Sequence, residues 1–150
     1  MKRCYIVLIS FLFCTKLFAL TPFSLEGLKE VNVALVDKGK LLNLEQKKAL
    51  EKEIEQKLHR LNIQTSSKHF SNFLVKAERI KSSHSSLYHV SLSLSETTTL
   101  HRSKKPLEAI ALTYIKEDMF ESQNPFEDIK ESLLFLLEEF AEQYMEENQK

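Results

Sequence analysis

Outside residues 1–19, which contain both cysteines, the side chains best suited to act as nucleophiles or metal ligands are the histidines and a row of hydroxyls. A serine nucleophile commonly stands on a strained turn within a Gly-x-Ser-x-Gly motif, and the sequence contains no such motif. Its serines instead alternate with apolar residues, which is typical of a regular strand with one polar face. We therefore expect ordinary solvated hydroxyls at Ser91, Ser93 and Ser95.

The five histidines lack the spacing of a metal site. His89 and His101 share one face of a predicted strand, but they would lie roughly 40 Å apart along it. His84 is nearer to His89, yet it falls in a predicted turn, and no carboxylate or cysteine stands at ligand spacing. We expect no metal and no other cofactor, and surface positions for His59, His69, His84, His89 and His101.

The sequence also gives no support for phosphate binding or for acid–base catalysis. The two glycines, Gly27 and Gly39, cannot form a glycine-rich phosphate loop. Carboxylate pairs such as Glu138 with Glu142 lie on a predicted exposed helix face, whereas acid–base catalysis needs a pocket that separates two pKa values. A binding function is therefore favoured, and a small periplasmic hydrolase or metal-dependent enzyme is the alternative.

Charge is balanced overall but unevenly distributed along the chain. The 21 basic and 21 acidic residues give a formal net charge of zero, which provides no electrostatic reason to bind nucleic acid. Residues 20–116 hold 16 Lys or Arg and 10 Asp or Glu, whereas residues 117–150 hold 2 and 11. The acidic end is either the solvated face of a helix or a docking surface for a basic partner.

Two clusters are candidate contact surfaces. On the last predicted helix, Phe135 falls opposite the apolar stripe among carboxylates, as an aromatic anchor of an interface would. The first cluster consists of Phe135, Glu131, Glu139 and Glu142. The second lies in a predicted turn, where cations could contact an anionic ligand such as phosphate or a lipid headgroup, and consists of Arg102, Lys104 and Lys105.

Residues 1–19 have the composition of a secretory signal peptide. A basic start precedes an apolar run from Cys4 to Cys14, and the small Ala19 marks a cleavage point. The run is shorter than the about 20 apolar residues of a membrane span. An uncleaved anchor is the alternative, and only then would we expect membrane association. We expect an exported protein, periplasmic or secreted, with a single domain over residues 20–150.

Alternating apolar and polar residues predict the strands. In Leu87–His101 the apolar positions are regular, so we place this strand centrally in an antiparallel sheet. The segment Leu107–Ile115 is apolar on both faces, so we expect it within the sheet or against a second layer. Other strands are predicted at Leu28–Val36, near Ile63 and Thr65, and at Phe73–Ile80.

Capping signals predict two helices. One follows Asn43, which can form a capping box with Gln46, and ends near Asn62, a residue tolerated in the left-handed conformation. The other begins at Pro125. Both carry an apolar stripe, so the element order β-α-β-β-β-β-α predicts a two-layer α+β sandwich, with both helices on one face of an antiparallel-rich sheet and the serine row on the other.

The signal peptide, the long alternating strand and the closing amphipathic helix together resemble small exported bacterial proteins with a two-layer α+β domain. The general plan also resembles domains of some envelope-assembly lipoproteins, although Phe13 before Cys14 does not fit a lipid-anchor cysteine. The resemblance assigns no functional residue. The sequence predicts a non-enzymatic envelope protein that binds another envelope protein or envelope component.

Overall fold

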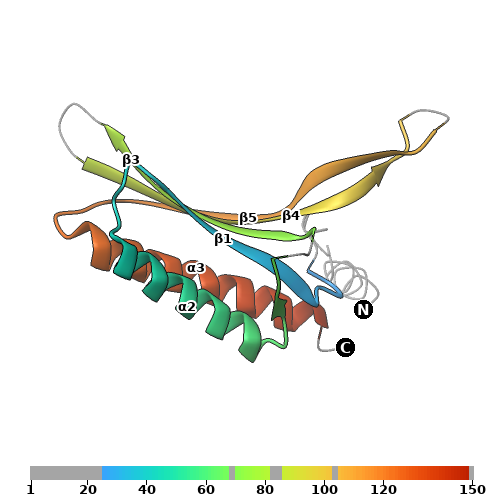
Figure 1. Cartoon of the computed structure of the whole chain (residues 1–150), viewed down its shortest axis with the longest axis horizontal. Helices are drawn as coiled ribbons and strands as arrows, with labels where there is room; N and C mark the ends of the chain where they lie inside the picture. Colours follow the sequence, from blue (N-terminus) through green and yellow to red (C-terminus); the bar gives the residue numbers. More distant parts are fainter. Residues whose placement is uncertain (1–24, 68–69, 82–85, 103–104, 149–150) are drawn as a thin grey trace, which may run out of the picture.

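The computed structural model describes residues 25–67, 70–81, 86–102 and 105–148, and within them two helices cover one face of a five-stranded sheet (Figure 1). The predicted α+β fold, with both helices on one face, is confirmed. The predicted signal peptide lies outside the described residues. The elements are β1 (Glu30–Lys38), α2 (Leu44–Arg60), β2 (Gln64–Thr65), β3 (Asn72–Lys81), β4 (Ser86–Leu100), β5 (Leu107–Glu121) and α3 (Pro125–Asn148).

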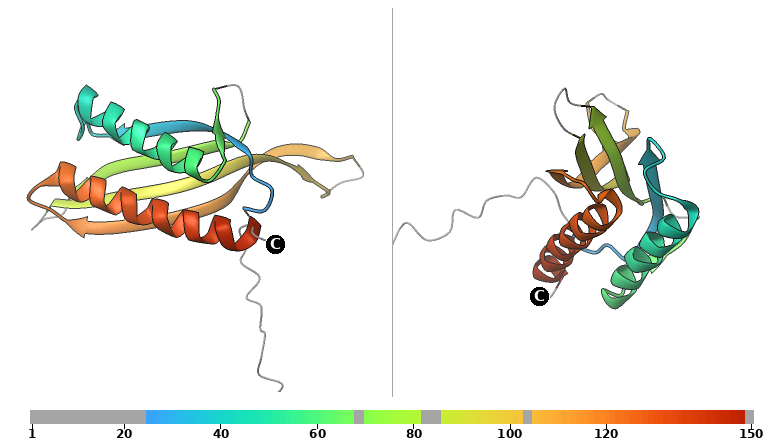
Figure 2. Two further views of the ribbon diagram at one scale, coloured as in Figure 1. Left: turned by 90° about the horizontal axis from the view of Figure 1, so that it is seen from below. Right: turned by 90° about the vertical axis from the view of Figure 1, so that its left-hand side faces the viewer.

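The sheet has the strand order β2-β1-β3-β4-β5. β1 pairs in parallel with both β2 and β3, and α2 provides the crossover that parallel neighbours require. β3, β4 and β5 form an antiparallel meander, so β4 is hydrogen-bonded on both sides, as expected for an interior strand. In Figure 2, α2 runs along the β1 side of the sheet and α3 along the β5 side.

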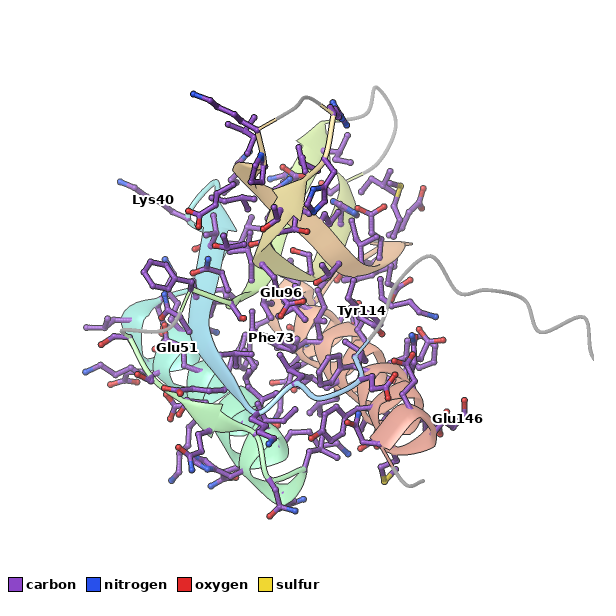
Figure 3. All side chains as sticks on the ribbon, turned by 90° about the vertical axis from the view of Figure 1, so that its right-hand side faces the viewer. Lys40, Glu51, Phe73, Glu96, Tyr114 and Glu146 are labelled. Carbon is purple, nitrogen blue, oxygen red and sulfur yellow. The ribbon has the colours of Figure 1, made fainter. Side chains whose placement is uncertain are left out.

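The core lies between the sheet and the helices. Four apolar residues of β4 at alternate positions point toward the helices and are buried, because successive strand residues alternate between faces; they are Tyr88, Val90, Leu92 and Leu94. Phe140 of α3 packs edge-on against Phe73 of β3 and Tyr114 of β5, with ring centroids 5.0 and 5.3 Å apart. Figure 3 shows Phe73 and Tyr114 on the helix-covered side of the sheet.

Local signals set the ends of the helices. The Asn43 side chain accepts a 2.9 Å hydrogen bond from the Gln46 backbone, and the Gln46 side chain accepts one of 2.9 Å from the Asn43 backbone, which confirms the capping box. Asn62 has a φ of 61°, as predicted for the end of this helix. α3 begins at the predicted Pro125.

The connection from β1 to α2 is built around the buried carboxylate of Asp37. This carboxylate accepts backbone hydrogen bonds from Leu41 at 2.9 Å and Leu42 at 3.1 Å, and pairs with Lys47 at 3.2 Å. Burial acts to raise the pKa of Asp37, but the two backbone N–H groups and Lys47 together hold it below its usual value. Asp37 therefore stabilises this turn in its ionised form.

The strand Leu107–Ile115 was predicted within the sheet or against a second layer, which is wrong for residues 107–112 and holds at Tyr114, whose ring packs on α3. β5 is an edge strand that continues to Glu121. Its pairing with β4 is interrupted by a bulge between Leu94 and Ser95, and on the Ser95 side of this bulge both strands extend away from the helices (Figure 1). We call residues 95–102 and 105–112 the hairpin arm. The β5 segment of the arm carries apolar residues on both faces, and no helix covers either face. The exposed fractions of Leu107, Ile110 and Leu112 are 63%, 77% and 50%.

Candidate functional site

A groove of about 410 Å³ lies between the edge strand β5 and the first half of α3. Its volume falls within the range of small-ligand pockets, about 300 to 1,000 Å³. We call it the acidic groove, because four of its seven lining residues are carboxylates. β5 contributes Asp118, Phe120 and Glu121, and α3 contributes Asp128, Glu131, Ser132 and Phe135.

The register of β5 and the period of α3 bring these side chains together. Phe120 pairs with the buried Tyr88 of β4, so it points to the helix-covered side, and the two rings stack with centroids 6.1 Å apart. On α3, Ser132 and Phe135 are three positions apart and therefore lie on one side of the helix. Phe135 is 57% exposed, as its predicted position opposite the apolar stripe requires.

Three of the four carboxylates of the acidic groove form no salt bridge with another described residue. Among the described residues, no salt bridge involves Asp118, Asp128 or Glu131. Asp128 accepts a short hydrogen bond from Ser122, which leaves its charge in place. Several carboxylates in a partly enclosed groove attract cations more strongly than the same charges on a flat surface.

Ser132 adds an unpartnered polar group to the acidic groove. Its side chain is buried, with 6% exposed, and its hydroxyl has no hydrogen-bond partner among the described residues. A buried polar group without a partner costs about 1–3 kcal/mol, so native structures usually satisfy such groups.

The structure separates the first predicted cluster into two parts. Phe135 and Glu131 line the acidic groove. Glu139 lies outside it and pairs with Lys116 at 3.4 Å, and Glu142 is exposed outside it. The β5 side of the groove was not predicted from the sequence, because the expected strand ended at Ile115.

The second predicted cluster lies at the tip of the hairpin arm. Arg102 and Lys105 are exposed there, and Lys104 lies outside the described residues. The exposed apolar residues of β5 follow directly after this tip. The arm thus presents cations and aliphatic side chains together.

The face of the sheet without helices carries a histidine between two carboxylates. His89 has its Nδ1 3.1 Å from Glu78 and its Nε2 3.5 Å from Glu117, and its side chain is only 13% exposed. Two hydrogen bonds hold the pKa of Glu78 below its usual value. The bond from Lys76 has the larger effect and the bond from His89 the smaller. His89 thus lies on the uncovered face of the sheet, but Glu78 and Glu117 on the flanking strands leave little of its side chain exposed. Ser91, on the same face, is also buried rather than solvated.

Among the described residues, no group of three or more histidine, cysteine, aspartate or glutamate side chains has the arrangement to hold a metal ion. Neither described helix has a stretch apolar and long enough to cross a membrane.

Comparison of the sequence with protein-family models and with curated proteins found no match in either case.

Proposed function

We propose that this protein is a non-enzymatic binding module of the bacterial cell envelope, and that its acidic groove binds a basic, partly aliphatic segment of a partner polypeptide. The envelope location rests on the signal-peptide composition of residues 1–19. The binding role rests on the groove.

The proposal rests mainly on one observation. In the acidic groove, an exposed and a half-buried aromatic ring lie beside carboxylates that form no salt bridge with a described residue. Phe135 and Phe120 offer apolar surface, while Asp118, Asp128 and Glu131 offer negative charge within the same groove. A lysine or arginine side chain suits both, because its aliphatic stem packs on rings while its charged end reaches a carboxylate.

The test is the binding of two labelled synthetic peptides, one alternating lysine with leucine and the other alternating glutamate with leucine. Fluorescence anisotropy measures affinity at low and at physiological salt. We expect the basic peptide to bind, more weakly as salt rises, and the acidic peptide not to bind. Phe135→Ser should weaken binding of the basic peptide by about tenfold or more, as expected for an aromatic anchor.

Matched controls separate the groove from general surface effects. Phe70→Ser removes a phenylalanine that is 80% exposed and precedes β3, near the opposite end of the sheet from the groove. Glu146→Gln removes an exposed carboxylate from the distal end of α3 (Figure 3), to be compared with Glu131→Gln inside the groove. Equal affinity of all variants for the basic peptide, or equal binding of both peptides, would overturn the proposal.

A further inference from the structure

The hairpin arm has the chemical character of a ligand for the acidic groove. Its exposed aliphatic side chains include Ile110, with 77% exposed, and Leu112, with 50% exposed. At its tip Arg102 and Lys105 are exposed, whereas the two carboxylates of the arm lie away from the tip turn, Glu96 at the base and Glu108 on β5. The tip is therefore basic and is followed by aliphatic side chains, whereas the groove is acidic and aromatic.

The arm and the groove of one chain lie at opposite ends of β5 (Figure 1). Ile110 and Phe120 would be about 33 Å apart at the rise of an extended strand. Because both belong to one continuous strand, the arm cannot fold back onto its own groove while the strand stays intact. An arm that occupies a groove must belong to another copy.

We infer that the partner of the acidic groove is a second copy of this chain, whose hairpin arm docks in the groove head to tail; this inference rests on the function proposed above. In this contact, an aliphatic side chain of the arm packs between Phe120 and Phe135. Arg102 meets carboxylates of the groove such as Glu131. The two contacting surfaces differ, so each bound copy still offers one free arm or one free groove, and repetition produces a ring or an open filament.

The first measurement is sedimentation velocity of the full chain over a range of concentrations, at low and at high salt. We expect the weight-average mass to rise with concentration, and less so at high salt, because the contact joins opposite charges. The arm variant Arg102→Glu/Ile110→Ser and the groove variant Glu131→Lys/Phe135→Ser should each weaken self-association by about tenfold or more. The control Lys52→Glu/Leu44→Ser changes an exposed charge and an exposed aliphatic residue of α2, and should associate as the wild type does.

The decisive measurement is an equimolar mixture of the arm variant with the groove variant. The arm variant keeps a competent groove and the groove variant keeps a competent arm. The mixture should therefore form a one-to-one dimer and no larger species, at concentrations where each variant alone stays monomeric. A symmetric contact between identical surfaces would not give this result.

Three results would overturn the inference. They are a wild-type chain that stays monomeric at every concentration, self-association that survives in both variants, and a mixture that stays monomeric. A monomer that instead binds anionic phospholipid vesicles through Arg102 would assign the arm to a membrane surface. The peptide experiment distinguishes failure of the self-docking from failure of the proposed binding function. A monomeric chain whose groove still binds the basic peptide contradicts only the self-docking.

Discussion

The Thr113 hydroxyl donates a 2.7 Å hydrogen bond to the carboxylate of Glu96, at the point where the hairpin arm leaves the body of the protein. Thr113 is the extra residue that β5 inserts at the bulge, since Leu94 pairs with Tyr114 and Ser95 with Leu112. The other oxygen of Glu96 accepts a 3.2 Å hydrogen bond from Ser71. Glu96 thus connects the bulge of β5 to the residue before β3 and holds the base of the arm.

Replacement of Glu96 by alanine should loosen the hairpin arm. Hydrogen bonds to a charged acceptor contribute about 1.5–3 kcal/mol each, and partial exposure of Glu96 places the expected loss at the lower end, near 1.5 kcal/mol of unfolding free energy. Urea denaturation measures this loss, and hydrogen exchange should become faster in the arm than in the core. Glu108→Ala, an exposed glutamate on the same arm, is the matched control. Equal stability and exchange in the two variants would contradict the assigned role.

The buried carboxylate of Asp37 should make stability depend on acid pH. Its folded pKa lies below the unfolded value of 3.8, so its contribution is present above pH 3.8 and is lost as the pH falls toward the folded pKa. Asp37→Asn should cost about 2 kcal/mol at pH 7, because two backbone N–H groups and Lys47 lose a charged partner. The difference from the wild type should shrink below pH 3.8. Urea denaturation at several pH values measures this difference, with Glu55→Gln on the exposed face of α2 as the control. A difference independent of pH would show that the charge of Asp37 is unimportant.

Export should remove both cysteines. If cleavage follows Ala19, the chain recovered from the bacterial periplasm lacks Cys4 and Cys14, so its intact mass is that of residues 20–150 and a thiol reagent finds no reactive group. The same chain retained in the cytoplasm is the control and should titrate two thiols. An exported chain whose mass includes residues 1–19 would support the anchored alternative.

The elements of the fold were predictable because their signals are local. The Asn43–Gln46 capping box and the left-handed Asn62 depend on hydrogen bonds and backbone angles within a few residues. The alternation in β4 indicates a strand with one buried face wherever that strand lies. For the same reason the helical period alone identified Phe135 and Glu131 as neighbours outside the apolar stripe.

The β5 side of the acidic groove was not predictable from such patterns. Asp118, Phe120 and Glu121 lie in a mixed stretch of charged and apolar residues whose alternation is weak. An apolar strand in the interior of a sheet and an uncovered arm have the same sequence pattern, so the exposure of Ile110 could not be distinguished from burial. The environment of His89 depends likewise on register, which brings Glu78 and Glu117 to it from the two neighbouring strands.

Local sequence patterns were enough to locate the helices and strands, their apolar faces and most of the charge. These properties follow from backbone periodicity and hydrogen bonding over short distances. The packing of the whole chain was needed to show that β5 is an edge strand, that its far end meets α3, and that Ser132 lies buried beside four carboxylates. Those relationships arise from strand order and helix packing between segments far apart in the chain, and no local pattern encodes them.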